Sequence, residues 1–188
     1  TLGLGGHSEA LLSQGDDNLK IIAFELDNQN LDYAKKRLEK YASRVSYVNA
    51  NFSTFKESLD KLGIKQVDGI LLDLGLSSPH VDDAERGFSY RAEGPLDMRF
   101  DKTQDLTAEV ILNTWSEEDL KLILRKYGEI GNCMFLVRAI LEERERNPFK
   151  TTTQLAEVIK KVTYAKKQMS TITKVFQALR VAVNDELG

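Results

Sequence analysis

The sequence predicts an α/β protein whose first half contains a parallel sheet and whose second half is helical. Three short runs rich in apolar and β-branched residues indicate strands, and helical patterns separate them, an alternation typical of βαβ units. A loop-rich stretch follows the third run, and from Thr107 onward the pattern is helical. Hydrophobic residues make up 41% and charged residues 29% of the 188 positions, which indicates one globular domain, or one domain carrying a small insertion.

The three expected strands are Leu19–Glu25, Arg44–Asn49 and Val67–Leu74. The first and the last are almost uniformly apolar, so we expect them to be buried on both faces of the sheet. Between them, apolar residues at helical spacing predict a helix over Asn28–Ala42 and a shorter helix that ends near Gly63.

The region after the third strand divides into a joint and a helical part. Residues 76–105 contain several glycines and prolines without a clear period, and long ordered loops in compact domains are usually functional. Ser116 and Thr151 each precede an acidic or amide residue by three positions, a capping-box pattern that opens helices over Glu117–Tyr127 and through Val162. Cys133–Arg146 and residues 173–187 are helical by pattern as well.

The charge is distributed unevenly along the chain. The net charge is -3, but residues 121–167 contain eleven Lys or Arg against five Glu, a balance of +6 on an otherwise acidic chain. Such a basic segment is suited to contact a polyanion, although solvated helix faces give the same pattern. The single cysteine, Cys133, excludes an internal disulfide and cannot build a zinc site alone, and no apolar run approaches the ~18 residues that span a bilayer. We therefore expect a cytoplasmic protein with no membrane association and no metal.

The first eight residues form a glycine-rich turn that leads into a helical pattern. Gly5 and Gly6 allow positive φ and close approach of a ligand to main-chain amides at a helix start. Glu25 follows Gly6 by nineteen residues, at the tip of the next strand, where an acid can accept hydrogen bonds from a ribose diol. Asp27 could fill the role instead, and a solvated loop acid is the plainer alternative. The pattern indicates a nucleoside cofactor without identifying it.

A second candidate carboxylate follows the third expected strand. Asp73 precedes a turn that contains Gly75 and Pro79, which places it at the carboxyl edge of a parallel sheet. Ligands of open α/β sheets bind at that edge. The alternative is that Asp73 only caps the loop.

Six short motifs stand in order along the chain: Gly5-Gly6-His7, Asn51-Phe52-Ser53, Asp73–Pro79, Asp83–Ser89, Gly94–Arg99 and Phe176–Arg180. Together they closely resemble the MraW/RsmH family of ribosomal RNA cytosine-N4 methyltransferases, and the likeness covers nearly the whole chain. The order of Arg-Gly-Phe-Ser and then Gly-Pro-Leu-Asp-Met-Arg is its most specific part.

The resemblance implies a Rossmann-like class I methyltransferase core, residues 1–104 and 171–188, with a helical insertion at 105–170 that recognises substrate. The implied cofactor is S-adenosylmethionine, and the implied partner is small-subunit ribosomal RNA or the assembled small subunit. The implied cofactor contacts are Gly5, Gly6, His7, Glu25, Phe52, Asp73 and His80. Of these, Phe52 would pack on the adenine, although a core aromatic is the commoner fate, and His80 would lie near the departing methyl group, although a loop histidine is usually only solvated.

The chain also departs from the family pattern. Members have a strand before the glycine turn and further strands after the last helix, so we expect a core that is incomplete at both ends. Ser170-Thr171-Ile172 stands where His-Pro-Ala is usual, and Ile130–Phe135 stands where a basic helix is usual.

The catalytic group and the substrate stay open at this point. Ser77, Ser78 and Asp97 are candidate acceptors for a proton of the attacking amine, and none is assigned as a general base. One rival interpretation is a methyltransferase acting on another amine, in DNA, a different RNA or protein. The other is a non-catalytic RNA- or ribosome-binding module that keeps the fold.

Overall fold

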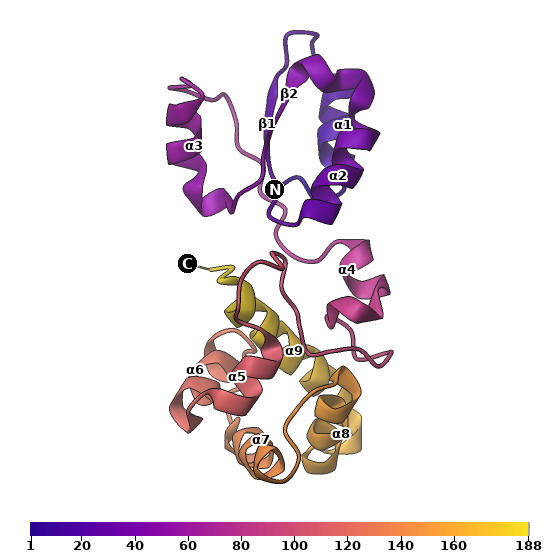
Figure 1. The fold of residues 1–188 in the computed structure, drawn as a ribbon, viewed down its shortest axis with the longest axis vertical. Helices are drawn as coiled ribbons and strands as arrows, with labels where there is room; N and C mark the ends of the chain where they lie inside the picture. Colours follow the sequence, from indigo (N-terminus) through magenta and orange to yellow (C-terminus); the bar gives the residue numbers. More distant parts are fainter. Residues whose placement is uncertain (188) are drawn as a thin grey trace. The chain divides into compact units, whose positions relative to one another are not determined.

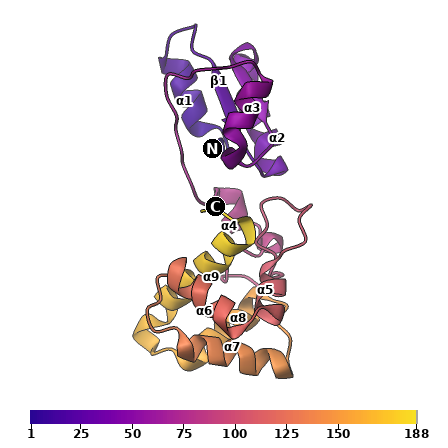
Figure 2. The same ribbon diagram turned by 90° about the vertical axis from the view of Figure 1, so that its left-hand side faces the viewer.

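The computed structural model describes residues 1–187, and the chain divides into two compact units at Ser77–Ser78 (Figures 1 and 2). The expected domain boundaries, at 104–105 and 170–171, differ from this division. Each unit is described by itself.

The first unit contains a small parallel sheet. Strands β1, Ile21–Phe24, and β2, Val45–Val48, pair in parallel with Ile21 opposite Val45. Helices α1, Gly6–Gln14, and α2, Asn28–Arg37, lie on one side of the strands, and α3, Phe55–Lys61, lies on the other side (Figure 1). The first two predicted strands and the βαβ connection between them are confirmed.

The core of this unit lies between α1, α2 and the sheet. Leu31, Ala34 and Leu38, the positions at helical spacing along α2, are at most 4% exposed and pack in one cluster with strand residues Ala23 and Val45. Helix α2 ends at Arg37, earlier than predicted, and a short 3₁₀ segment, Glu39–Arg44, continues to β2. Helix α3 has no buried residue, so the core is one-sided.

The third predicted strand is wrong for the described chain. Residues 67–74 form no strand, and Ile70 and Leu72 are 68% and 56% exposed. A strand needs a neighbouring backbone along its whole length to satisfy its amide and carbonyl groups. Here Thr1 is bonded to the end of the run, where its hydroxyl oxygen accepts the Asp73 N–H at 2.9 Å. The apolar run is therefore an irregular segment whose side chains face solvent.

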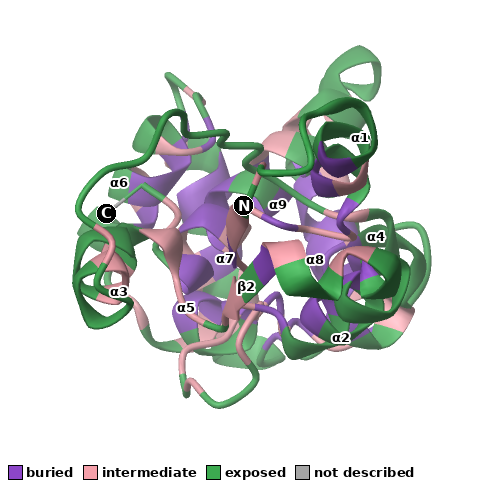
Figure 3. Cartoon of the chain, turned by 90° about the horizontal axis from the view of Figure 1, so that it is seen from above, coloured by how far each residue is buried: buried purple, intermediate pink, exposed green. Residues whose placement is uncertain are grey.

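The second unit is helical. Its helices are α4 Ser78–Asp82, α5 Ala108–Thr114, α6 Glu117–Lys126, α7 Met134–Arg146, α8 Thr152–Val162 and α9 Gln168–Asn184. Helix α9 packs against α5, α6 and α8, and α7 packs against the same three helices. Figure 3 shows buried residues along the inner faces of these helices and exposed residues outside. Ile172, Val175 and Leu179 of α9 are at most 1% exposed within this core, which joins the C-terminal helix to α5–α8.

Both predicted capping boxes are confirmed at their N-caps. The Ser116 hydroxyl accepts the N–H of Asp119 at 3.1 Å, and the Thr151 hydroxyl accepts the N–H of Gln154 at 3.2 Å. Each bond satisfies an amide that the first turn of a helix leaves without a partner. Helix α9, in contrast, begins five residues before its predicted start at residue 173.

The joint between strands and helices is an ordered loop in which two motifs contact each other. A Cβ added at Gly87 would lie 2.0 Å from the Pro95 carbonyl oxygen, and one added at Gly94 would lie 1.9 Å from the Ala84 carbonyl oxygen. Gly87 also has φ +72, which disfavours other residues. Each of the two motifs therefore needs its glycine because the backbone of the other motif touches it there.

Candidate functional site

The glycine-rich turn opens α1 with its backbone in the left-handed region. Gly3 has φ +54 and Gly5 has φ +79, and a Cβ at Gly5 would come within 3.3 Å of the Leu38 side chain. The backbone of the glycine turn can therefore lie this close to the end of α2 only with glycine at position 5. Among the described residues, no side chain caps the start of α1 at Gly6. The amides of its first turn lack intrahelical partners, which suits them to an electron-rich ligand group.

Glu25 is held beside this turn. It follows β1 directly, and its carboxylate accepts the Gly3 N–H at 2.8 Å and the Asp27 N–H at 3.0 Å, one on each oxygen. A carboxylate can accept about four hydrogen bonds, so this anchored group can still receive hydroxyl donors. Glu25 is thus fixed in orientation at the end of β1, next to the backbone of the glycine turn.

Asp27, the alternative acid, has a structural role. It is 2% exposed, and it caps α2 by accepting the N–H of Gln29 at 2.8 Å and that of Asn30 at 3.3 Å. A buried carboxylate that caps a helix is poorly placed to bind a ribose diol as well. The geometry therefore favours Glu25 over Asp27 as the diol acceptor.

Asp73 lies at the same edge as the glycine turn. Its Oδ2 is 3.3 Å from Nδ1 of His7, and both side chains are about two-thirds exposed, at 64% and 65%. Its backbone N–H is bonded to the Thr1 hydroxyl, at the beginning of the glycine turn. The structure thus brings the glycine turn, Glu25 and Asp73 together, although the run that leads to Asp73 is not a strand.

Phe52 lies at the start of a short 3₁₀ turn, Phe52–Thr54, that follows β2. The side chain of Asn51 caps this turn by accepting the Ser53 N–H at 2.9 Å. Phe52 is half-buried, so part of its ring remains accessible. Its packing on an adenine stays a prediction.

His80 belongs to the second unit, where it is 3% exposed. Its ring stacks on Phe100 with centroids 4.9 Å apart and lies 5.0 Å from the Phe88 ring. The alternative of a solvated loop histidine is therefore wrong. Its contact with a cofactor stays a prediction.

Asp97 is bound on both oxygens by Arg99. The guanidinium Nε and Nη2 lie 2.8 and 2.9 Å from the two carboxylate oxygens, and Nη1 donates to the carbonyls of Lys102 and Gln104. Burial raises the pKa of Asp97, but the hydrogen bonds from Arg99 outweigh it and leave that pKa below its ordinary value. This carboxylate organises the loop and is a poor candidate acceptor for a proton of the attacking amine.

The other two candidate acceptors are serines. Ser77 donates to the Asn30 side chain at 3.2 Å, and Ser78 is exposed at the start of α4.

Two asparagines hold the segments that carry candidate site residues, and the role of neither was predicted from the sequence. Asn49 donates from its amide to the Glu25 carbonyl at 2.9 Å and fixes the end of β1. Asn184 bridges the Met98 carbonyl and the Phe100 N–H, both at 2.7 Å, and so ties α9 to the motif loop. In the sequence, Asn49 is visible only as an asparagine at a strand end and Asn184 only as an asparagine in a helix. Many asparagines without such a role occupy the same kinds of position.

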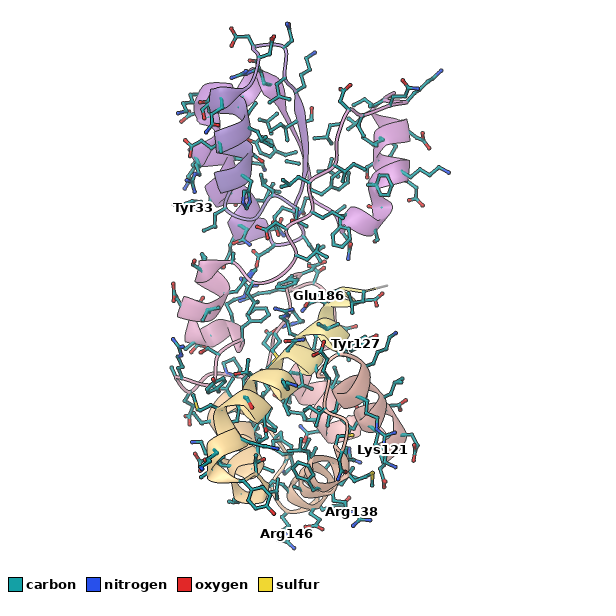
Figure 4. All side chains as sticks on the ribbon, turned by 180° about the vertical axis from the view of Figure 1, so that it is seen from behind. Tyr33, Lys121, Tyr127, Arg138, Arg146 and Glu186 are labelled. Atoms are coloured by element: carbon teal, nitrogen blue, oxygen red, sulfur yellow. The ribbon has the colours of Figure 1, made fainter. Side chains whose placement is uncertain are left out.

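Most basic residues of the segment at 121–167 are exposed and lack an ion-pair partner within the described part of the chain. Lys121 and Lys160 pair with acids of their own helices, and Arg144 donates to the carbonyls that end α5. The remaining eight basic residues are exposed and have no ion-pair partner within 4.0 Å among residues 1–187: Arg125, Lys126, Arg138, Arg146, Lys150, Lys161, Lys166 and Lys167. Figure 4 shows Arg138 and Arg146 pointing outward from α7.

Residues 1–187 contain neither a metal-binding cluster nor a membrane span. No three His, Cys, Asp or Glu residues gather in this described part of the chain as a metal site would require. None of its helices combines the length and the apolar character of a membrane span.

Comparison with known proteins agrees with the motif resemblance. Residues 1–188 match the MraW methylase family. Two curated proteins named Ribosomal RNA small subunit methyltransferase H, from Halothermothrix orenii and Clostridioides difficile, are 45% and 40% identical to the chain over 191 residues. The alignments cover the whole chain and 61% of each relative, so the chain spans about three-fifths of the length of these proteins.

Proposed function

Because the chain belongs to the MraW methylase family, we propose that the complete protein transfers a methyl group from S-adenosylmethionine to the N4 amine of a cytidine in small-subunit ribosomal RNA. Family membership carries the class I methyltransferase fold. The observation that supports the cofactor most directly is the meeting of the glycine turn, Glu25 and Asp73 at one edge of the first unit. The N4 position rests on the motif resemblance, and the RNA on the names of the relatives.

The residues at this edge fit S-adenosylmethionine. Its ribose has two neighbouring hydroxyls, which suit the anchored carboxylate of Glu25. Its methionine end has a carboxylate, which suits the amides at the start of α1, Gly6 and His7 among them. Its adenine is an aromatic surface that the half-buried Phe52 could cover.

The chain's own residues would contribute mainly by positioning the reacting groups, and less by transferring protons. S-adenosylmethionine would supply a methyl group on a sulfonium, from which an amine nitrogen would displace the thioether sulfur in line. The S–C bonding pair would stay with sulfur as the N–C bond forms, and the proton lost by the amine would pass to water. Asp73, exposed at the edge, is placed to orient the reacting groups, and correct alignment alone lowers such barriers substantially. No side chain is assigned as the proton acceptor.

We propose further that residues 105–170 are an inserted domain of a Rossmann-like core and that they recognise the substrate. The eight exposed basic residues described above all lie within this range. A surface of unpaired lysines and arginines suits the phosphates of RNA. The exposed apolar run at residues 67–74 fits an interior strand of a larger sheet, which is how the family core would use it.

The test is methyl transfer by the complete protein to isolated small ribosomal subunits and to naked ribosomal RNA. With isotope-labelled S-adenosylmethionine, we expect label in RNA and N4-methylcytidine on nucleoside mass spectrometry. Label in another base, in DNA or in protein would contradict the substrate. S-adenosylmethionine binding without transfer, or no binding at all, would indicate a binding module instead of an enzyme.

A further inference from the structure

The turn between α8 and α9 presents an aromatic ring to solvent. Tyr164 is 87% exposed, more than any other large hydrophobic residue among those described as exposed, and Met169, in the first turn of α9, is 60% exposed. A tyrosine that contacts almost nothing contributes little to folding, while its ring adds exposed apolar area. The ring is therefore available to a partner.

The turn that carries this ring is held firmly. The side-chain amide of Gln168 donates to the carbonyl of Lys160 at 3.0 Å and to that of Thr163 at 3.3 Å, which links the end of α8 to the start of α9. The Lys167 N–H also donates to the Tyr164 carbonyl at 2.8 Å. These bonds fix the backbone on both sides of Tyr164, so binding to the ring would not have to order this turn as well.

The surroundings of the ring are positively charged. Lys161, Lys166 and Lys167 lie within three residues of Tyr164, are exposed, and form no ion pair with any residue that the structure describes. Glu157 is the nearest acid in the segment, and it is already paired with Lys160 at 2.6 Å. Unpaired cations around an exposed aromatic ring are the features with which proteins bind single-stranded nucleic acid.

We propose that Tyr164 stacks on an unpaired base of the RNA substrate while the neighbouring lysines contact its phosphates. This inference rests on the proposed function and adds to it that the basic surface binds single-stranded RNA. A duplex keeps its bases inside the helix, so it offers phosphates to the lysines but no base face to the ring.

The test is the affinity of the complete protein for a fluorescein-labelled single-stranded oligonucleotide of ribosomal RNA and for a duplex of equal length, by fluorescence anisotropy. Tyr164→Ala should weaken single-strand binding about 5- to 150-fold, the range for loss of one base–aromatic stack. Duplex affinity and the salt dependence should change little, because no charge is removed. Tyr164→Phe should bind as wild type, and Tyr164→Leu should bind as poorly as Tyr164→Ala.

Tyr33→Ala is the matched control, since Tyr33 is a 53% exposed tyrosine on α2 of the first unit (Figure 4). Single-strand affinity of Tyr164→Ala within twofold of wild type would overturn the proposal, as would equal losses on duplex or full rescue by leucine. Loss of binding to phosphatidylserine vesicles with unchanged RNA affinity would overturn it in favour of a lipid surface. The methyl-transfer assay tests the proposed function independently. If the enzyme is active but its RNA affinity does not depend on Tyr164, only the stacking proposal is refuted.

Discussion

The first unit leaves an apolar run of its sequence in solvent, whereas the second buries most of its apolar positions in one core. In the second unit, five helices, α5–α9, pack their apolar faces together. A helix satisfies its own backbone hydrogen bonds, so it needs only a packing partner. In the first unit, residues 67–74 need a neighbouring backbone as well, and among residues 1–187 only Thr1 is hydrogen-bonded to this run.

This difference extends to the chemistry of the two units. The candidate cofactor groups in the first unit are held by turns and strand ends: Glu25 by two backbone amides, and Asp73 by its bond to Thr1. The candidate RNA-binding groups in the second unit project from helices and from the turn between α8 and α9. The cofactor site therefore depends on backbone geometry, and the RNA surface depends on side chains that can be changed without disturbing the fold.

The largest expected effect concerns glycines in the two units. Gly87→Ala should destabilise the protein by about 3 kcal/mol or more, because the new Cβ would clash with the Pro95 backbone at a position of positive φ. Gly3→Ala should cost about 1–2 kcal/mol, because φ is positive but no atom lies within 4 Å of the new Cβ. Urea denaturation of both variants measures the difference. Equal losses would mean that the two motifs of the joint do not touch.

Removing the exposed carboxylate of the first unit should affect the cofactor alone. Asp73→Ala should weaken S-adenosylmethionine binding about ten- to a hundredfold, the value of a hydrogen bond to a charged group. Its stability should hardly change, because the side chain is 64% exposed. Calorimetric titration decides it, and an unchanged dissociation constant would remove Asp73 from the site.

Neutralising lysines of the second unit should affect RNA alone. Replacing Lys161, Lys166 and Lys167 with Gln should flatten the salt dependence of RNA binding, by up to about 0.7 units of slope for each phosphate that the variant no longer neutralises. Lys160→Gln should add less, because Lys160 is paired with Glu157. A triple change of Lys56, Lys61 and Lys65, exposed in the first unit, is the control. If both triple variants behave alike, the basic surface has no special role.

The smallest expected effect separates two acids of the first unit. Glu25→Gln should lower S-adenosylmethionine affinity by about 2- to 12-fold, because an amide oxygen is a poorer acceptor for a ribose diol. Asp27→Asn should be nearly neutral for binding, because asparagine also caps helices well. Calorimetry on the pair compares them directly. Damage from Asp27→Asn alone would reverse the assignment made from the geometry.

Features of the fold and of the candidate site that depend on interactions between residues close in sequence were predicted from the sequence. Strands β1 and β2, the core face of α2 and the caps at Ser116 and Thr151 follow from local patterns, and each was predicted. The motif resemblance correctly identified the family.

The features that the sequence did not reveal depended on partners distant in the chain. Residues 67–74 have the composition of a buried strand, but pairing depends on a neighbouring backbone that composition does not reveal. His80 reads as a loop histidine, and its burial depends on Phe88 and Phe100. The roles of Asn49 and Asn184 likewise depend on contacts 24 and 84–86 residues away in sequence.

Hydrogen exchange of the complete protein, with S-adenosylmethionine and with single-stranded RNA in turn, tests the division of roles most directly. The cofactor should slow exchange in residues 1–8, where the amides that open α1 lie, and leave residues 160–170 unchanged. RNA should slow exchange at 160–170 and leave 1–8 unchanged. Protection of 160–170 by the cofactor, or of residues 1–8 by RNA alone, would contradict the assignment of the cofactor to the glycine turn and of the RNA to the turn between α8 and α9.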